Sequence, residues 1–473
     1  MRDMIAGPYA PVLQETVCDK LEIQGEIPSD LNGVYLRNGP NPRYTPQGRY
    51  HWFDGDGMLH AAHFDRGRLT YRNRWVRTDA FAREEAERRA LYWGVMESHK
   101  GRGDKPMKDS ANTDVIGHGG VALASWYLAG EIYRVHPLTL ETLGKLPLGG
   151  RFSAPHPKVD PATGELMYFD YQNEVPYMSY GVIGDDGQPK HRVPIDLPGA
   201  RLPHDMAITE RYSILHDLPL FHDVDALRAG RHKIDFHAEL PARFGIIPRY
   251  GAAESIRWFE APPCWLYHTV NAWEEGEEVV MVACRYMPAR DAHGAIDEGK
   301  TARMIAELQM DARLCRWRFN LKTGQTKEEI VDPEHNLEFP TSNARRIGRR
   351  SRWAYQMEQT REAPHFTAVV KQDIDSGAIQ RWSDGPGSYY SEAPFAPAEH
   401  PVAEDDGYLV SFVWNEDAKR SEIQIFDARD LARGPVARAR VPQRIPAGFH
   451  AAWIEAGHIA RRHGAPGRSR HTA

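Results

Sequence analysis

Four histidines of this chain lie in similar surroundings. His156 and His204 each follow a proline, in Ala-Pro-His-Pro and Leu-Pro-His-Asp, whereas His268 and His450 lie in aromatic stretches, Trp-Leu-Tyr-His-Thr-Val and Gly-Phe-His-Ala-Ala-Trp. A single histidine in apolar surroundings is ordinarily a hydrogen-bonded core residue, but the recurrence of the context favours a shared site. The four form no local motif such as H-E-x-x-H, so the fold must bring them together. Imidazole nitrogens suit iron, copper, zinc and nickel, and nitrogen ligands beside open positions suit non-haem iron(II).

Two glutamates are candidates for supporting such a site. A set of four imidazoles is uncharged, so we expect carboxylates to accept hydrogen bonds from the outer ring N–H groups and to balance the charge of a metal. Glu338, in Leu-Glu-Phe-Pro, and Glu392, in Ser-Glu-Ala-Pro-Phe, have strand-like and partly apolar contexts. A glutamate in such a run more often faces solvent, so the inward orientation depends on the histidines being assembled.

Short strands separated by turns must position these residues. An apolar strand, a turn of Asp, Asn, Thr or Gly and a second strand recur at residues 158–169, 317–326, 370–379 and 423–431. Such units, spread over most of a chain, predict an all-β fold of the β-propeller kind, in which inner strands converge on one axis. The clearest helical stretch is 81–97, rich in Ala, Glu and Arg. We expect residues 1–30 to form an N-terminal arm, 31–454 the propeller, and 455–473 a basic, disordered tail.

The composition limits the function. The 473 residues are 41% hydrophobic and 26% charged, with a net charge of −6, which argues against a nucleic-acid partner. The four cysteines form no C-x-x-C pair, so a thiolate zinc site or a disulfide framework is not expected. The N-terminal residues lack the apolar core of a signal peptide, and no apolar run is long enough to span a membrane. We therefore expect a cytoplasmic enzyme or binding protein.

A series of short motifs follows in order along the chain, from Gly33 to Trp453. Each motif is weak alone, but in this order and together with four matched histidines the motifs are specific. They read Gly-Val-Tyr-Leu-Arg-Asn-Gly-Pro-Asn-Pro, His-Trp-Phe-Asp-Gly-Asp-Gly-Met, Asn-Arg-Trp-Val-Arg-Thr, Ala-Asn-Thr-Asp-Val, Ala-Pro-His-Pro-Lys, Pro-His-Asp-Met-Ala-Ile-Thr, His-Thr-Val-Asn-Ala-Trp-Glu, Leu-Glu-Phe-Pro and Gly-Phe-His-Ala-Ala-Trp. With these motifs the chain resembles the carotenoid cleavage oxygenase family, which includes the retinal pigment epithelial membrane protein and bacterial stilbene-cleaving dioxygenases.

The resemblance implies a seven-bladed propeller capped by a dome of loops and helices. One Fe(II) would lie on the axis, and its four ligands would be His156, His204, His268 and His450. Glu338 and Glu392 match two of the family's three supporting glutamates. Leu128 aligns with the third. Glu131 is three residues further on and, on a strand, would face the other way, so we expect only two carboxylate partners.

Three further positions border the expected site. Thr113, in Ala-Asn-Thr, resembles a threonine that crowds an open iron position in the family; the alternative is a strand threonine satisfied by the backbone. Phe53 and Tyr127 are candidates for lining the substrate cavity. Stilbene-cleaving members have a lysine where Tyr127 aligns, which helps to ionise the substrate phenol. A tyrosine carries no positive charge and would stabilise a phenolate less.

The resemblance implies an Fe(II)- and O2-dependent dioxygenase that cleaves a conjugated carbon–carbon double bond into two aldehyde or ketone products. The missing lysine favours a carotenoid or apocarotenoid substrate, and a stilbenoid is the runner-up. From a different class, a non-catalytic propeller that binds its ligand without metal would purify without iron and consume no O2. The expected partner is a lipophilic small molecule. In the family an apolar mouth dips into the membrane, which implies peripheral contact with its inner face, and no obligate protein partner is predicted.

Overall fold

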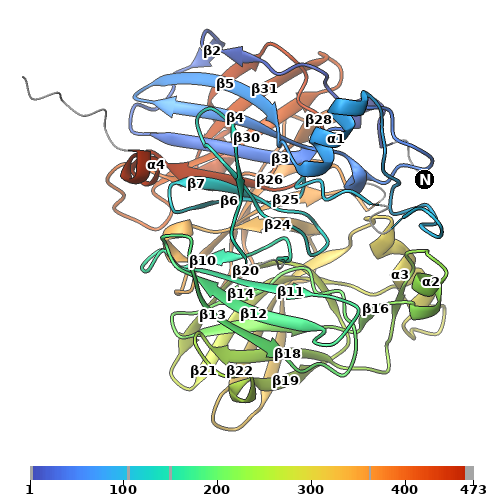
Figure 1. The fold of residues 1–473 in the computed structure, drawn as a ribbon. Coiled ribbons are helices and arrows are strands. Elements are labelled where there is room, and N and C mark those ends of the chain that lie inside the picture. The colour runs from blue at the N-terminus through green and yellow to red at the C-terminus, as the bar shows by residue number, and fades with distance from the viewer. Residues whose placement is uncertain (1–3, 104–106, 149–151, 362–363, 464–473) are drawn as a thin grey trace, which may run out of the picture.

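The protein is rich in strands, as a computed structural model of residues 4–103, 107–148, 152–361 and 364–463 shows (Figure 1). The α-helices of these residues are short: α1 (Asp79–Glu87), α2 (Val224–Arg228), α3 (Glu298–Ala306) and α4 (Ala456–His463). The predicted all-β class is therefore confirmed. Helices α2 and α3 lie at one edge of the molecule, on the right in Figure 1, and α4 lies at the opposite edge.

Four antiparallel sheets of four strands follow one another along the middle of the chain. In each, the strands pair in sequence order. The first two consist of β6 (Val115–His118), β7 (Val121–Ala124), β8 (Tyr133–Val135) and β9 (Thr142–Lys145), and of β10 (Lys158–Val159), β11 (Leu166–Tyr171), β12 (Met178–Ile183) and β13 (Pro189–Ile195). The next two consist of β14 (Ala207–Ile208), β15 (Tyr212–Asp217), β18 (Ala242–Pro248) and β19 (Arg257–Ala261), and of β20 (Trp265–Glu275), β21 (Glu278–Tyr286), β22 (Ala312–Asn320) and β23 (Thr326–Asp332). Strands β16 (Leu220–His222) and β17 (Ile234–Phe236) form a separate two-stranded sheet, which lies in the chain between β15 and β18 of the third sheet.

The two ends of the chain meet in one sheet. Strand β33 (Ala451–Glu455) pairs with β3 (Gly33–Pro40), with Tyr35 opposite Trp453, and β4 (Gly57–Asp65), β5 (Arg68–Trp75) and β1 (Val17–Cys18) continue that sheet. The remaining strands form one ten-stranded sheet, in which β28 (Ser388–Tyr390) joins two antiparallel groups. One group is β24 (Leu337–Thr341), β25 (Trp353–Gln359), β26 (Phe366–Asp373) and β27 (Ile379–Trp382); the other is β29 (Phe395–Pro397), β30 (Gly407–Asn415), β31 (Arg420–Asp427), β32 (Pro435–Val441) and β2 (Glu22–Gly25).

Burial distinguishes inner strands from outer ones. Every residue of β3 is buried, and β20 and β21 are buried along nearly their whole length, whereas β5 alternates between buried and half-buried positions. A strand covered on both faces needs a continuous apolar run, and a strand with one wet face needs alternation. The inner strands can therefore carry polar residues only where these find partners, which is the setting of the histidines.

The structure corrects two expectations about local structure. The helix expected at 81–97 ends at Glu87, because Arg88 adopts a left-handed conformation with φ of 55°. Within the expected N-terminal arm, β1 pairs with β5 and β2 with β32. The tail expected to be disordered from residue 455 begins as the end of β33 and helix α4, and residues 464–473 lie outside the described part.

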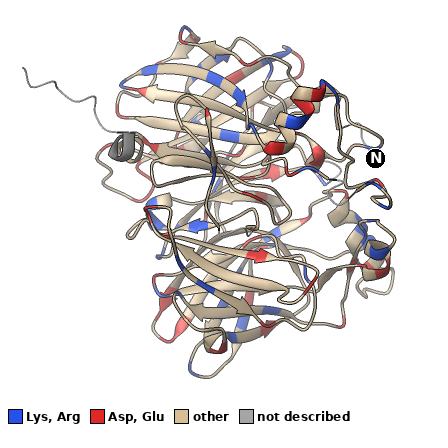
Figure 2. Cartoon of the chain, viewed as in Figure 1, with Lys and Arg blue, Asp and Glu red and all other residues tan. Residues whose placement is uncertain are grey.

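Positions of both charge signs are interspersed along the strands and loops rather than segregated (Figure 2). None of the helices formed by residues 4–103, 107–148, 152–361 and 364–463 has the length and apolar character needed to cross a membrane.

Candidate metal centre

The structure brings the four predicted histidines together. The ring centroid of His156 lies 4.7 Å from that of His204, 5.0 Å from that of His268 and 4.5 Å from that of His450. The Nε2 atoms of His156 and His204 are 3.1 Å apart, and the ring nitrogens of His156, His268 and His450 lie within 4.8 Å of one another. All four residues are buried. We call this group the histidine cage.

The cage is built at edge strands of four different sheets. His156, His204 and His450 lie just before β10, β14 and β33, and His268 lies within β20. Three acids occupy the equivalent places in the groups without a histidine: Asp114 before β6, Glu338 in β24 and Glu392 before β29. Each group of strands thus contributes one ionisable side chain to the centre, and prolines or bulges beside several of them free the local backbone from regular pairing.

Three cage histidines are backed by carboxylates. The Nδ1 atom of His268 lies 2.5 Å from Oε2 of Glu338, and Nδ1 of His450 lies 3.2 Å from Oε1 of Glu392. The other oxygen of Glu392 accepts the N–H of Ala451. Both glutamates are therefore placed as expected. An Nδ1–H that donates to a carboxylate leaves the Nε2 lone pair of the same ring free to face inward.

Asp114 is the partner that the sequence prediction missed. Its Oδ2 atom lies 2.9 Å from Nδ1 of His156, so the expectation of only two carboxylates is wrong. The signal was present in Ala-Asn-Thr-Asp-Val, where an acid directly precedes a strand. The motif does not single it out, because an acid before a strand is common in turns and the family resemblance pointed to Leu128 instead.

His204 is the exception in the cage. Among the residues that the structure describes, no carboxylate hydrogen-bonds to it, and Leu128 lines the same cavity as His204. Glu131 instead forms an ion pair with Lys145, with 3.3 Å between Oε1 of the glutamate and Nζ of the lysine. The glutamate is thus engaged outside the cage, although residues 125–132 form no strand, so the alternation expected from a strand does not explain its placement.

The electrostatics keep most of the cage neutral. Burial lowers the pKa of His156, His204 and His268 below the ordinary histidine value. Burial acts in the same direction on His450, but the charge and hydrogen bond of Glu392 outweigh it, and the pKa of His450 is raised. The Nε2 atom of His268 is buried without a hydrogen-bond partner. Four imidazoles gathered in this way, with the Nε2 atom of His268 unpaired and those of His156 and His204 facing each other, form a donor set that fits a transition metal.

An apolar cavity of about 440 Å³ reaches the cage at His204. Phe53 and Tyr127 both line it, as expected, and their rings stack with centroids 4.0 Å apart. Ile305 of α3 closes one side, and Leu128 and Tyr267 complete the wall near His204. The cavity can therefore hold a long apolar molecule against the cage.

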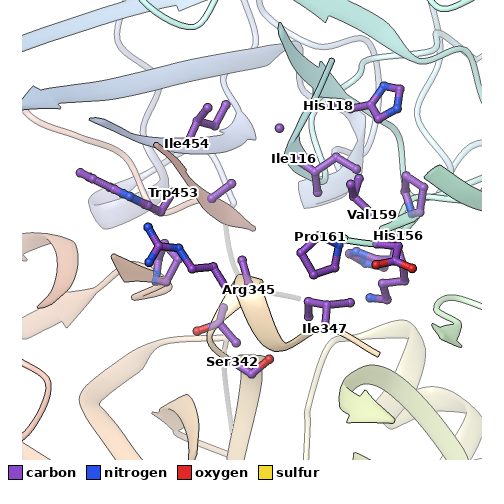
Figure 3. Close-up of a pocket in the computed structure, with 18 of the residues that line it drawn as sticks. Ile116, His118, His156, Val159, Pro161, Ser342, Arg345, Ile347, Trp453 and Ile454 are labelled. Atoms are coloured by element: carbon purple, nitrogen blue, oxygen red, sulfur yellow. The ribbon is translucent and has the colours of Figure 1, made fainter. Parts of the chain in front are cut away.

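A second, more polar cavity of about 470 Å³ touches the other three histidines. It shares no lining residue with the apolar cavity. Figure 3 shows its lining, in which Ile116, Val159, Pro161, Ile347 and Ile454 surround the opening and His156 lies behind them. Ala302 and Ile305 of α3 line the apolar cavity and His458 of α4 lines the polar one, so the two cavities extend toward opposite edges of the molecule (Figure 1).

Thr113 is buried beside the cage. Its N–H donates to the carbonyl of Ser125 at 2.9 Å, and its carbonyl accepts the N–H of His450 at 3.3 Å. Its hydroxyl donates to Oδ1 of Asn112 at 3.0 Å. These contacts give Thr113 a structural role in holding the His450 segment, and its effect on an open metal position stays a prediction.

Comparison with known proteins agrees with this site. Residues 9–455 match the family described as retinal pigment epithelial membrane protein. The chain is 37% identical to the carotenoid 9,10(9',10')-cleavage dioxygenase of Crocus sativus, over 95% of this chain and 88% of that protein. It is 30% identical to the isoeugenol monooxygenase of Pseudomonas nitroreducens, over 95% of this chain and 97% of that protein.

Solved structures give the same result. The lignostilbene dioxygenase of Pseudomonas brassicacearum superposes with a TM-score of 0.84 at 30% identity, covering 96% of this chain and 98% of that one. A variant of the apocarotenoid oxygenase of Synechocystis superposes with a TM-score of 0.81 at 26% identity, covering 95% and 98%. The chain therefore belongs to the retinal pigment epithelial membrane protein family. It is an oxygenase of the carotenoid-cleavage type, so the alternative of a non-catalytic binding module is set aside.

Proposed function

We propose that this protein is an iron(II)- and O2-dependent dioxygenase that cleaves a conjugated double bond of a carotenoid or apocarotenoid. The observation that carries the proposal is the apolar cavity that ends at His204 of the cage. A polyene is long, apolar and electron-rich, so it needs a channel of this kind and no charged group beside the reacting carbons. The similar dioxygenase of Crocus sativus is named for such a reaction.

The metal would be held by His156, His204, His268 and His450. The inward nitrogens and the three supporting carboxylates fit a divalent ion, since Asp114, Glu338 and Glu392 compensate the positive charge that four neutral ligands cannot. When bound, iron(II) supplies the activation of O2 for addition to the alkene.

The chain itself would position the substrate and exclude water. The stacked rings of Phe53 and Tyr127 and the apolar wall beside them fix which double bond faces the cage, because the cavity admits the polyene in few orientations. Cleavage of the double bond into two carbonyl products requires no proton transfer from the protein.

The arrangement of strands supports a seven-bladed propeller as the scaffold. Four blades would be the four-stranded sheets, two would be the groups joined through β28, and the seventh would be closed by β33 on β3. In this proposal the helices α2 and α3 with the β16–β17 pair form the dome over the apolar cavity, residues 31–454 form the propeller, and the arm 1–30 and the segment from 455 onward are additions to it.

A stilbenoid is the second candidate substrate, because the lignostilbene dioxygenase and the isoeugenol monooxygenase are both close in sequence or structure. Burial raises the pKa of Tyr127 well above the ordinary tyrosine value, so its hydroxyl cannot act as a base at neutral pH. Lys233, a cation lining the cavity, has its ammonium 2.9 Å from a carboxylate oxygen of Asp223. Arg303 of α3 is a second cation that lines the cavity, so the case against a phenol rests on Tyr127 and not on an absence of positive charge.

Steady-state kinetics on an apocarotenal and a 4-hydroxystilbene, run side by side in detergent with iron-loaded protein, test the proposal. We expect the higher kcat/KM for the apocarotenal and two carbonyl products by mass spectrometry. A clearly higher kcat/KM for the stilbene would assign the protein to the second candidate.

We also propose that the protein is cytoplasmic and contacts the inner face of a membrane on the side of the apolar cavity. Val224 of α2 is 52% exposed there, and Arg228 follows it on the same helix. Sedimentation with anionic vesicles, compared between the wild type and Val224→Asp, tests this part.

A further inference from the structure

Asp205 follows the one cage histidine that lacks a carboxylate partner, and it is almost fully buried, with 1% of its surface exposed. Its Oδ1 atom lies 2.7 Å from Nζ of Lys158. Its Oδ2 atom accepts the backbone N–H of Thr269 at 2.7 Å and the hydroxyl of Thr269 at 2.8 Å. A single carboxylate thus holds two other segments of the chain.

Those segments carry cage histidines. Lys158 is two residues after His156, and Thr269 directly follows His268. The side chain of Asp205 therefore links the start of β14 to the start of β10 and to β20, which are the strands that present His204, His156 and His268. Both Lys158 and Asp205 also line the polar cavity on the far side of the cage from the apolar one.

We propose that Asp205, with Lys158 and Thr269, is a positioning residue that fixes His204 relative to His156 and His268 in the metal centre. The proposal rests on the proposed metal site. Asp114, Glu338 and Glu392 fix the other three histidines by hydrogen bonds to their ring nitrogens. Asp205 fixes His204 through the adjoining backbone instead.

Stability alone does not account for this arrangement. A buried ion pair is weak evidence for stability, because the cost of taking both charges out of water can exceed their attraction. The contacts themselves are short and charge-assisted: the ammonium of Lys158 and both donors of Thr269 lie 2.7–2.8 Å from the carboxylate oxygens, which holds the three segments together.

The chain offers a matched control. Lys371 of β26 is also 1% exposed, and its Nζ lies 2.5 Å from Oδ2 of Asp405. This pair touches neither the cage nor the two cavities beside it. Breaking it removes a buried Lys–Asp ion pair without touching a segment that carries a cage histidine.

The test uses cobalt(II) as the metal, because its visible spectrum reports the arrangement of its ligands. For wild type, Asp205→Asn, Lys158→Met and Lys371→Met, we would measure the cobalt dissociation constant by chelator competition, the visible spectrum and the thermal midpoint of the metal-free protein. We expect Asp205→Asn to weaken cobalt binding about 10–100-fold and to change the spectrum, as loss of a supporting partner does. Lys371→Met should lower the thermal midpoint and leave affinity and spectrum unchanged.

The double variant gives a rescue. In Asp205→Asn the amide NH2 can face the Lys158 ammonium, which is unfavourable, so adding Lys158→Met should recover part of the lost affinity. Wild-type affinity and spectrum in Asp205→Asn, or equal changes in Lys371→Met, would overturn the proposal. If Asp205→Asn does not fold, Lys158→Met removes one arm of the link and Thr269→Val removes the hydroxyl contact of the other, while the N–H of residue 269 still donates to Asp205. A wild-type spectrum in the Lys158→Met, Thr269→Val double variant would overturn the proposal. A wild-type protein that binds no cobalt would instead refute the proposed metal centre.

Discussion

The two sides of the histidine cage are built differently. On the side of the polar cavity, His156, His268 and His450 each have a ring nitrogen hydrogen-bonded to a carboxylate. On the side of the apolar cavity, His204 lies among Leu128, Tyr267 and the Phe53–Tyr127 stack. A carboxylate on the outer nitrogen of His204 would have to be buried in apolar surroundings, which is costly without further partners.

The difference shows how one site can serve two requirements. The charge of a metal needs nearby carboxylates, whereas an apolar substrate needs a wall without them. The protein meets both requirements because Asp114, Glu338 and Glu392 hydrogen-bond to the other three histidines and none of them to His204. In our proposal His204 is instead held through the contacts of Asp205. The predictions below test that division, beginning with the largest expected effect.

Removing a ligand should have unequal consequences on the two sides. We expect both His268→Ala and His204→Ala to abolish turnover, a loss of at least about 100-fold, since a missing ligand costs more than a missing supporting partner. His204→Ala should retain more iron, because it leaves the three histidines whose nitrogens lie within 4.8 Å of one another. Iron content per chain and product formation measure this; equal iron loss in both variants would contradict the division.

The three supporting carboxylates should matter to a similar degree. We expect iron retention or activity to fall by about 10–100-fold in each of Asp114→Asn, Glu338→Gln and Glu392→Gln. An uncharged amide oxygen accepts the hydrogen bond from the histidine N–H less strongly than a carboxylate does. Chelator competition followed by iron analysis would check this. Wild-type retention in all three would mean that the charge of the metal is balanced elsewhere.

Changes in the apolar cavity should spare the metal. Phe53→Ala removes an aromatic stack worth about 0.5–1.5 kcal/mol, so we expect KM for an apocarotenal to rise about 2–10-fold with iron content unchanged. Tyr127→Phe keeps the stacked ring and should leave kcat/KM within about twofold, because the polyene does not need the hydroxyl. A large loss in Tyr127→Phe would show that the hydroxyl contacts the substrate.

The smallest effect is expected at Glu131. Its ion pair with Lys145 is partly exposed to solvent and lies outside the cage, so Glu131→Gln should change the free energy of unfolding by less than about 1 kcal/mol. Iron content and kcat/KM should match the wild type. Loss of iron in this variant would place Glu131 at His204 and reverse the assignment of Leu128.

The sequence predicted the members of the site more securely than the lengths of the elements. The four histidines and two of the carboxylates stood out because their proline-containing or aromatic contexts recur along the chain and match the motifs of the family. Asp114 was missed because an acid before a strand is common in turns, and nothing local marks its contact with His156. The helix at 81–97 was predicted too long because composition does not show where Arg88 turns the chain.

The sequence by itself determined the strand-rich class, the family and the residue types at the centre. These depend on local patterns along the chain and not on which segments pack together. The tertiary structure alone decided which acid backs which histidine, that the acids lie on one side of the cage, and that Asp205 reaches Lys158 and Thr269. The physical reason is that each of these contacts joins segments carried by different sheets, and the relative placement of sheets depends on packing across the whole molecule.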